Sequence, residues 1–393
     1  MMELKNKAKT LSIVRFDGKV MKDIKNIAKG NKKDKELSIL NTLKFSFDNN
    51  EMKVLYKNQE YSITQNFDSD SVVTSGNSEF LIDFDVVKKL THINNDEEYS
   101  FQVLDNKVEF TRNDGKITLD TFSIKEHDFT NNIENNFTHI DDINHNEILK
   151  LNRALHSVSK LDSRPVLKNV LIRDGMIHST DSHRLFRVNS DIKYDNDIKL
   201  AHDGVKKLKD IFNKNEEIQL LIDENDSFDE SKGVYKDKYA CFKSGNKKVE
   251  IKMNRNNYPE LNRLIPTDFT TEIVISDMKE FNQIIQNATK NSKDMLNNPI
   301  ILTITNSNLK VTSRKSEEYS EDNYIKSIDI DNFYGEDLKI VMNGKYLLDG
   351  IKQLNTKESI RCQFSGSMRP FIIRPEDNKQ DVLSLILPIR NFY

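Results

Sequence analysis

The feature that most constrains this chain is an order of elements that occurs three times along it. Each occurrence opens with an amphipathic stretch, GKVMKDIKNIAKG from Gly18, NEILKLNRALHSVSKL from Asn146 and DMKEFNQIIQNATKN from Asp277. Apolar residues return every three or four positions in these stretches, which predicts helices. The repeat length of about 130 residues is much longer than that of a solenoid repeat, so each unit is large enough to be a domain.

The elements after each first helix also match. Two alternating stretches follow, with turn-forming pairs between them at Asn49-Asn50, Asp174-Gly175 and Asn306-Ser307. A second amphipathic stretch then follows, SEFLIDFDVVKKLTHI from Ser78, AHDGVKKLKDIFNKN from Ala201 and NGKYLLDGIKQLN from Asn343. The pattern predicts an α+β protein of three tandem domains, each with two helices packed on antiparallel sheets.

Domain boundaries are expected near residues 135 and 267. The Asn-rich segment NNIENNF at 131–137 and the Pro-containing NRLIPTD at 262–268 fall between the units, and both compositions are typical of linkers. A chain of 393 residues also exceeds what a single core usually holds. The predicted domains are residues 1–135, 136–266 and 267–393.

Composition excludes several classes of protein. With 21 Phe and 12 Tyr, the chain has enough aromatic residues for cores, which argues against disorder throughout. Its two cysteines, Cys241 and Cys362, stand far apart and form neither a disulfide framework nor a zinc motif, so no metal or cofactor is expected. No signal peptide or membrane-spanning run is visible, which predicts a cytoplasmic protein without membrane contact. A net charge of −3 means that nucleic-acid binding would need a locally basic surface.

Four segments carry a resemblance to a known family. RPVLKNVLIRDGMIHSTDSHRLFRV at 164–188, with TDSHRL at 180–185, resembles the middle domain of the bacterial DNA sliding clamp, the beta subunit of the replicative DNA polymerase III holoenzyme. The segments NYPELNRLIP at 257–266, NGKYLLDGIKQL at 343–354, and MRPFIIRP at 368–375 with the following LSLILPIRNFY are similar to later parts of that family. The resemblance is strong in the second and third units and weak in the first.

The resemblance implies a non-catalytic processivity factor for DNA replication. In the family, two three-domain protomers close head to tail into a homodimeric ring that encircles duplex DNA, with twelve helices lining the hole. Sequence-independent phosphate contacts suffice there, because encirclement prevents escape by topology. The implied partners are the replicative DNA polymerase, the clamp loader and repair proteins, which present short Gln-containing hydrophobic motifs.

The resemblance implies three sets of functional residues. The implied partner-peptide pocket consists of Leu167, Thr180, Ser182, His183, Arg184, Leu185, Pro259, Arg263, Leu264, Leu385, Leu387, Pro388, Ile389 and Arg390. Cations expected to face DNA are Lys22, Lys25, Lys29, Lys150, Arg153, Lys206, Lys207, Lys209, Lys290 and Lys345, with Lys88, Lys89 and Lys352 on the same helices and Lys32, Lys33 and Lys35 in the loop GNKKDKE. The implied dimer interface includes Ile117, Ala288 and Thr289.

Simpler explanations exist for single members of these sets. Any one lysine equally fits a solvated helix face, and Leu385 equally fits a core strand. The stretch Asn287-Ala288-Thr289 is more polar than is usual in the family, which predicts a modest dimer affinity, and Asn391, Phe392 and Tyr393 extend beyond the Pro-x-Arg tail. The two aromatic residues of this extension could narrow the choice of partners.

Two other functions are considered. An adaptor could be built from the same repeats without enclosing DNA. A hydrolase is suggested by Asp181, Ser182 and His183, but neighbours on an extended strand point to opposite faces, whereas a triad converges from separate segments. The chain also contains no GxSxG, P-loop, HExxH or GxGxxG motif.

Overall fold

The computed structural model describes residues 10–90, 93–104, 107–113, 115–122, 136–224, 228–229, 233–306, 308–314, 322–377 and 379–390. The chain packs into two compact units. Unit 1 comprises residues 1–148 and 203–253, and unit 2 comprises residues 149–202 and 254–393. The predicted middle domain is therefore divided between the units, and the division into three domains stays a prediction.

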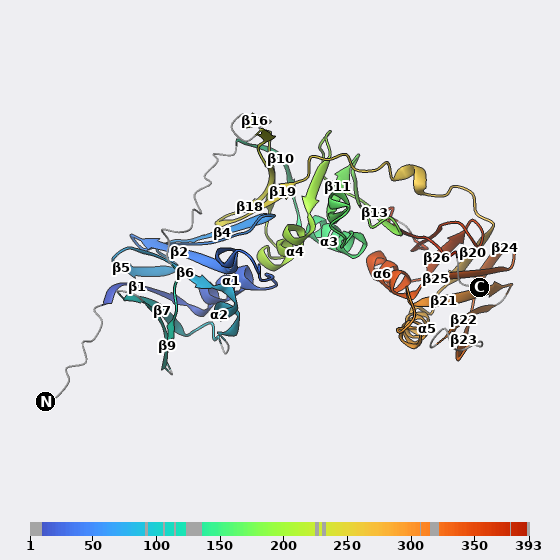
Figure 1. Ribbon diagram of the computed structural model, residues 1–393, viewed down its shortest axis with the longest axis horizontal. Coiled ribbons are helices and arrows are strands. Elements are labelled where there is room, and N and C mark those ends of the chain that lie inside the picture. Colours follow the sequence, from blue (N-terminus) through green and yellow to red (C-terminus); the bar gives the residue numbers. More distant parts are fainter. Residues whose placement is uncertain are drawn as a thin grey trace. The chain divides into compact units, whose positions relative to one another are not determined.

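Unit 1 is built on a long antiparallel sheet that crosses a repeat boundary (Figure 1). Its strands, in order of pairing, are β6 (Ser78–Asp83), β2 (Thr42–Asp48), β3 (Glu51–Lys57), β4 (Tyr61–Phe67), β19 (Lys247–Met253), β18 (Lys238–Ser244), β15 (Ile218–Asp223) and β10 (Phe137–Ile143). The boundary is crossed where β4 pairs with β19, with Ile63 opposite Val249. Backbone hydrogen bonds thus join the first repeat to the second.

A second sheet of unit 1 packs against the first through aromatic side chains. Its order is β5 (Val72–Ser75), β1 (Thr10–Asp17), β7 (Glu98–Leu104), β8 (Val108–Arg112) and β9 (Gly115–Leu119). Phe45 on β2 stacks on Phe80 at 5.0 Å and meets Phe101 of β7 at 5.1 Å, measured between ring centroids. A two-stranded ribbon, β16 (Phe228–Asp229) and β17 (Val234–Tyr235), completes the described strands of this unit.

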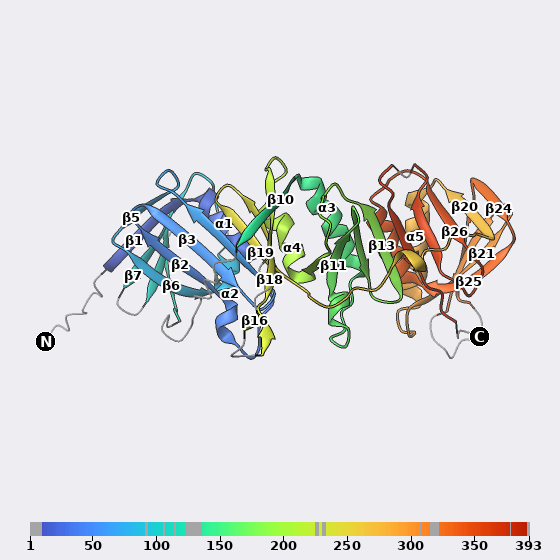
Figure 2. The same cartoon turned by 90° about the horizontal axis from the view of Figure 1, so that it is seen from above.

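Unit 2 repeats the same plan (Figure 2). Its long antiparallel sheet runs in the order β14 (Ile198–Ala201), β11 (Asn169–Arg173), β12 (Met176–Thr180), β13 (Arg184–Asn189), β28 (Leu383–Ile386), β27 (Phe371–Pro375), β26 (Ile360–Phe364), β20 (Thr271–Ile275) and β24 (Asn332–Gly335). The smaller sheet runs β23 (Tyr324–Asp329), β22 (Asn308–Ser313), β21 (Pro299–Thr305) and β25 (Leu338–Asn343). The pairing of β13 with β28 joins the second repeat to the third.

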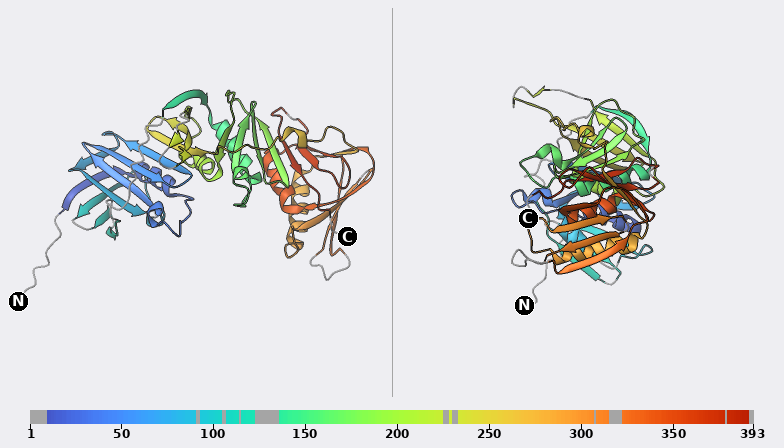
Figure 3. Two further views of the ribbon diagram at one scale, coloured as in Figure 1. Left: turned by 45° about the horizontal axis from the view of Figure 1, so that its top comes forward. Right: turned by 90° about the vertical axis from the view of Figure 1, so that its right-hand side faces the viewer.

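Each sequence repeat contains two of the α-helices of the described chain, which can be followed by colour in Figure 3. They are α1 (Gly18–Ala28), α2 (Phe84–Lys89), α3 (His145–Ala154), α4 (His202–Ile211), α5 (Met278–Asn291) and α6 (Gly344–Leu354). Helices α1 and α2 pack together in unit 1, and α5 and α6 pack together in unit 2. Asp17, Asp277 and Asn343 accept hydrogen bonds from the first backbone N–H groups of α1, α5 and α6, as N-cap residues do. None of these helices is long and apolar enough to cross a membrane.

Short 3-10 helices occur in the connections. They are η1 (Ser38–Asn41), η3 (Leu155–Ser157), η4 (Pro165–Lys168) and η5 (Asn262–Leu264). The last of these lies in the Pro-containing linker predicted at 262–268, whereas residues 131–135 of the other linker lie outside the described residues.

Most predicted elements agree with the structure. The helix expected from Asn146 to Leu161 ends earlier, at Ala154, and is followed by η3. The stretch from Ser78 was expected to be helical, but residues 78–83 form β6 because they pair with β2, and the helix begins only at Phe84. Asn49 and Asn50, like Asp174 and Gly175, have positive φ angles, as the predicted tight turns require. Ser307 of the third turn, and Asn391, Phe392 and Tyr393 of the tail, lie outside the described residues.

Helix α4 packs very closely on the long sheet of unit 1 at Gly204. A Cβ atom added there would lie 2.7 Å from Cγ2 of Ile251 on β19 and 3.2 Å from Cβ of Tyr61 on β4. Both distances are shorter than ordinary contacts between carbon atoms. The helix therefore rests on the strands at the repeat boundary through a residue without a side chain.

We expect Gly204→Ala to destabilise the protein. Overpacking typically costs about 1–3 kcal/mol, which exceeds the gain of about 1 kcal/mol that alanine brings inside a helix. Urea unfolding followed by circular dichroism measures the difference. The control is Lys209→Ala on the exposed side of α4, which should change the free energy of unfolding by less than about 0.5 kcal/mol. Unfolding of Gly204→Ala at the same or a higher urea concentration than the wild type would contradict the close approach.

Candidate functional site

The apolar residues predicted for the pocket meet where β13 pairs with β28 in unit 2. Leu185 lies opposite Leu385 in this ladder, and both are buried with Leu167 in a single apolar cluster. Leu387 packs against the cluster, and its backbone N–H donates to the carbonyl of His183 at 2.9 Å. Residues about 200 positions apart in the sequence thus form one floor.

The rim of this floor is partly exposed. Leu264 in η5 has 52% of its surface accessible, Leu387, Pro388 and Ile389 are half-buried, and Pro259, Arg263 and Arg390 are exposed. We use the name docking patch for the partly exposed apolar side chains Leu264, Leu387, Pro388 and Ile389 together with the buried floor, against which Leu387 packs. An apolar surface edged by arginines suits a short peptide with hydrophobic anchors.

Arg184 has a different role from the one expected for it. Its side chain is only 8% exposed and makes two ion pairs, from Nε to Asp181 at 2.9 Å and from an Nη atom to Asp349 of α6 at 2.7 Å. Its guanidinium also lies 4.3 Å from the ring centroid of Tyr346. Removing one partner of a buried ion pair typically costs about 3–5 kcal/mol. Arg184 thus fastens β13 to α6 beneath the docking patch.

Asp349 is the acceptor at the centre of this network. Burial opposes its ionisation, but hydrogen bonds from His156 and Arg184 outweigh that effect and lower the pKa of the Asp349 carboxyl. The ring of His183 stacks on Tyr346 with a centroid separation of 6.4 Å and is otherwise exposed. His183 therefore remains at the surface, where a ligand can reach it.

The segment Thr180–Arg184 is a tight loop and forms no catalytic triad. Asp181 Oδ1 accepts hydrogen bonds from the backbone N–H groups of His183 and Arg184, at 2.9 and 3.1 Å. Ser182 has a φ of +79°, and its Oγ accepts a hydrogen bond from Arg164. Among the interactions described for this loop, none joins Ser182 to the His183 ring. The aspartate is occupied in shaping the loop, so the arrangement lacks the base and orienter that a nucleophilic serine needs.

Several residues of the patch were not predicted from the sequence. Tyr258, Leu261, Ile372 and Leu383 are buried in the same apolar cluster, and Val166, Ile265 and Phe269 pack against it. The phenol of Tyr258 donates to the carbonyl of Asn169, and burial raises its pKa. Ile372 and Leu383 lie on β27 and β28, whereas the other five residues lie outside the strands. Only the folded chain therefore shows that all of them share one cluster.

The cations predicted to face DNA fall into three groups. The exposed group comprises Lys22, Lys29, Lys32, Lys33, Lys35, Lys89, Lys206, Lys209, Lys290, Lys345 and Lys352. Lys32 and Lys33 are 3.2 Å from the carboxylates of Asp203 and Asp85, at exposed sites where such pairs are weak. A phosphate could therefore compete for these two ammonium groups.

Members of the second group are bound within the fold. Lys207 is 2% exposed and donates to backbone carbonyls of Ile27 and Lys29, and Lys150 is 7% exposed and pairs with Asp191 at 3.4 Å. The half-buried Arg153 donates to the carbonyls of Gln353 and Leu354. Their assignment to the DNA-facing set is corrected on this ground.

Lys25 and Lys88 are intermediate cases. Both are half-buried, and their ammonium groups donate to the carbonyls of Leu90 and Asn31, respectively. Through these hydrogen bonds, Lys25 holds the chain just after α2, and Lys88 holds the chain just after α1.

The residues expected at a dimer interface differ in their exposure. Ile117 is 45% exposed on β9, at the edge of its sheet. Ala288 and Thr289 are buried, and the hydroxyl of Thr289 donates to the carbonyl of Ile285 one turn earlier. They face the interior of unit 2, which corrects that assignment. The exposed residues of this part of α5 are Gln286, Asn287 and Lys290.

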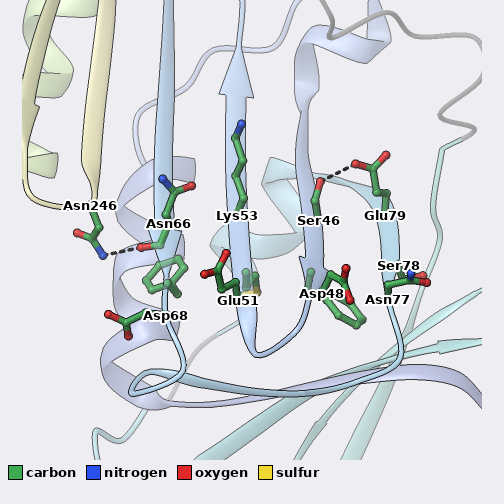
Figure 4. Close-up of a pocket in the computed structure, with 13 residues that line it drawn as sticks. Ser46, Asp48, Glu51, Lys53, Asn66, Asp68, Asn77, Ser78, Glu79 and Asn246 are labelled. Carbon is green, nitrogen blue, oxygen red and sulfur yellow. Dashed lines mark hydrogen bonds between the residues drawn. The ribbon is translucent and has the colours of Figure 1, made fainter.

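A cavity of about 770 Å³ lies in unit 1, away from any predicted site residue (Figure 4). Its lining includes the carboxylates of Asp48, Glu51, Asp68 and Glu79. Glu79 accepts a hydrogen bond from Ser46 and pairs with Lys44, and Asp68 accepts from the hydroxyl of Ser71. Asp68 and Glu79 are thus engaged locally, and we assign no function to the cavity.

Comparison with known proteins gives consistent results in sequence and fold. Residues 262–390 match the family described as the C-terminal domain of the DNA polymerase III beta subunit. The beta sliding clamp of Bacillus subtilis is 30% identical over 250 residues, and that of Streptococcus pneumoniae is 28% identical over 252 residues. These alignments span 62% and 61% of each chain, less than two thirds of the relatives' length.

The fold matches over nearly the whole chain. The crystal structure of the DNA polymerase III beta chain from Streptococcus pneumoniae aligns with a TM-score of 0.80 at 22% identity, covering 97% of this chain and 100% of that one. The Thermotoga maritima beta subunit aligns with a TM-score of 0.81 at 17% identity, covering 97% and 100%. In sequence over part of its length, and in fold over nearly all of it, the chain is similar to bacterial beta sliding clamps, the beta subunits of DNA polymerase III.

Proposed function

We propose that this chain is a DNA polymerase processivity factor: a non-catalytic clamp of three domains whose homodimer encircles duplex DNA and tethers replication and repair proteins. The observation that carries the proposal is the docking patch, where the second and third repeats share one apolar floor with a partly exposed rim. Relatives named beta sliding clamp over the aligned segment support it. The loop at Asp181, Ser182 and His183 gives no support to a hydrolase.

The patch suits a short peptide with apolar anchors near its end. Leu264, Leu387, Pro388 and Ile389 offer apolar surface, and the exposed His183 lies next to Leu387 in the ladder. Arg263 and Arg390 stand at the rim and can meet a carboxylate or a backbone carbonyl of the peptide. Clamp loader, polymerase and repair proteins would compete for this one patch.

DNA would be held by exposed lysines on the helices and in the loop at 30–36. Lys32, Lys33 and Lys35 are all exposed there, and flexible ammonium groups make phosphate contacts without reading sequence. Such contacts are weak individually and depend on salt, which permits sliding.

Ring closure would use two sheet edges. β9 ends the smaller sheet of unit 1, and β23 ends the smaller sheet of unit 2. Each edge presents an exposed isoleucine, Ile117 at 45% and Ile325 at 57%. Edge strands pair readily with another chain, so we propose that β9 of one protomer pairs with β23 of its partner, and that the second such contact closes the dimer.

The docking patch is tested with variants that leave the core intact. We expect Leu264→Ala combined with Leu387→Ala to weaken binding of a Gln-containing hydrophobic peptide by at least about tenfold, because each truncation removes roughly 1 kcal/mol or more of apolar contact. Fluorescence anisotropy with a labelled peptide measures the affinity. Leu296→Ala, at a site 81% exposed after α5, is the control and should bind normally. Equal affinity for all three proteins would remove the patch from the proposal.

The basic loop is tested by reversing its charge. Replacing Lys32, Lys33 and Lys35 with Glu should weaken DNA binding and reduce the slope of log affinity against log salt by about 3, roughly one per phosphate contact. The control reverses three exposed lysines that are not on these helices, Lys310, Lys357 and Lys379, and should keep the wild-type slope. A wild-type slope in the loop variant would place the loop away from DNA.

The dimer is tested by light scattering across a concentration series. We expect twice the mass of one chain for the wild type, and a single-chain mass for Ile117→Lys combined with Ile325→Lys, because buried unpaired ammonium groups oppose edge pairing. Val73→Lys, on the opposite edge of the smaller sheet of unit 1 and 56% exposed, should remain dimeric. A wild type that stays monomeric and is not retained on circular DNA would favour the adaptor.

A further inference from the structure

The end of α1 is held by a lysine from the second repeat. Lys207, on α4, donates through Nζ to the carbonyl oxygens of Ile27, at 3.3 Å, and of Lys29. These carbonyls belong to the last turn of α1 and its C-cap, where backbone acceptors lack partners within the helix and the helix dipole is negative. With 2% of its surface exposed, Lys207 is out of reach of a phosphate.

The end of α6 is held in the same way. Arg153, on α3 of the second repeat, donates from Nε to the carbonyl of Gln353 at 2.6 Å and from an Nη atom to that of Leu354 at 3.2 Å. In return, the side-chain amide of Gln353 donates to the carbonyl of Arg153 at 3.2 Å and to the hydroxyl of Ser157 at 2.9 Å. Gln353 is fully buried, so this reciprocal pair is shielded from water.

We propose that Lys207 and Arg153 are capping residues that join the repeats: each places its basic head group among the terminal carbonyls of a helix from a neighbouring repeat and holds that helix end in place. Both come from residues 136–266, one on each helix of that segment, and they act on α1 of the first repeat and α6 of the third. This role is separate from DNA binding and does not depend on the proposed function.

The surroundings of Lys207 make its cap depend on pH. Burial, with the ammonium groups of Lys88, Lys206 and Lys29, lowers the pKa of Lys207 from 10.5 to about 7, although Asp210 acts in the opposite direction. A neutral amine still carries two N–H groups, which match the two carbonyl acceptors. The cap therefore survives loss of the proton, and the folded chain no longer buries a charge.

The sign of the effect on stability follows from the two protonation states. Between about pH 7 and about pH 10.5 the unfolded chain keeps the proton on Lys207, whereas the folded chain has released it. The unfolded state thus binds more protons in this window, and the free energy of unfolding contributed by Lys207 rises with pH.

The first experiment compares melting temperatures of the full chain from about pH 7 to about pH 10. Lys207→Met should lack the increase in melting temperature with pH that Lys207 contributes to the wild type. The difference in melting temperature between the two proteins should therefore grow by several degrees towards high pH. Lys209→Met, at an exposed position on α4 whose charge is not among those that shift the pKa of Lys207, should follow the wild-type curve. Parallel curves for wild type and Lys207→Met would overturn the proposal for Lys207.

A second variant covers the case in which Lys207→Met does not fold. Lys207→Gln retains an N–H donor for the carbonyls but cannot titrate, so it should fold and show the flattened pH dependence. A Lys207→Gln protein that retains the wild-type pH dependence would also overturn the proposal.

The second experiment measures amide hydrogen exchange at the end of α6. Arg153→Met should accelerate exchange in residues 351–355 at least about tenfold, because the carbonyls of Gln353 and Leu354 lose their donors and the last turn opens more often. Lys352→Met, an exposed change in the same turn, is the control. Equal protection in the two variants would show that Arg153 does not hold the helix end.

Discussion

Two backbone ladders carry the organisation of this protein: β4 with β19 in unit 1, and β13 with β28 in unit 2. Each joins the last strand of one repeat, β19 or β28, to a strand of the repeat before it, so a sheet edge that would otherwise expose unpaired N–H and C=O groups is satisfied within the chain. The close approach of α4 at Gly204 and the apolar floor of the docking patch both lie on these ladders. Loss of the β4–β19 pairing would therefore disturb the packing of α4, and loss of the β13–β28 pairing would disrupt the apolar floor of the docking patch.

The positions of the basic residues show that a cation on these helices can have one of two roles. Where a lysine points to solvent, as Lys206 and Lys209 do, it is available to an anion. Where it points towards the end of another helix, as Lys207 does, carbonyl oxygens take the place of water around the ammonium group. The two positions are adjacent in the sequence, and a helical rotation of about 100° between neighbours separates surface from interior.

Much of the fold could be predicted from the sequence, because it rests on local signals. The helices at Gly18 and Asn343 have an N-cap residue and an apolar stripe, and the turns at Asn49-Asn50 and Asp174-Gly175 consist of residues that accept positive φ angles. The strand at 78–83 was missed because its pairing with β2 is a non-local interaction that outweighs local propensity. For the site, the motif at 180–185 indicated a segment that lies beside the β13–β28 ladder, and its role in docking stays a prediction. The motif did not show that Arg184 is buried in ion pairs with Asp181 and Asp349, or that Ala288 faces inward. Burial depends on segments that are distant in the sequence.

The place of β28 in the chain has a consequence for biosynthesis. The floor of the docking patch needs Leu385 opposite Leu185, so a ribosome must reach residue 385 before the patch can exist, although the loop at 180–184 has emerged long before. A nascent or truncated chain offers partners the loop without the floor. Under the proposed function, recruitment of other proteins would be reserved for chains whose second and third repeats have already joined.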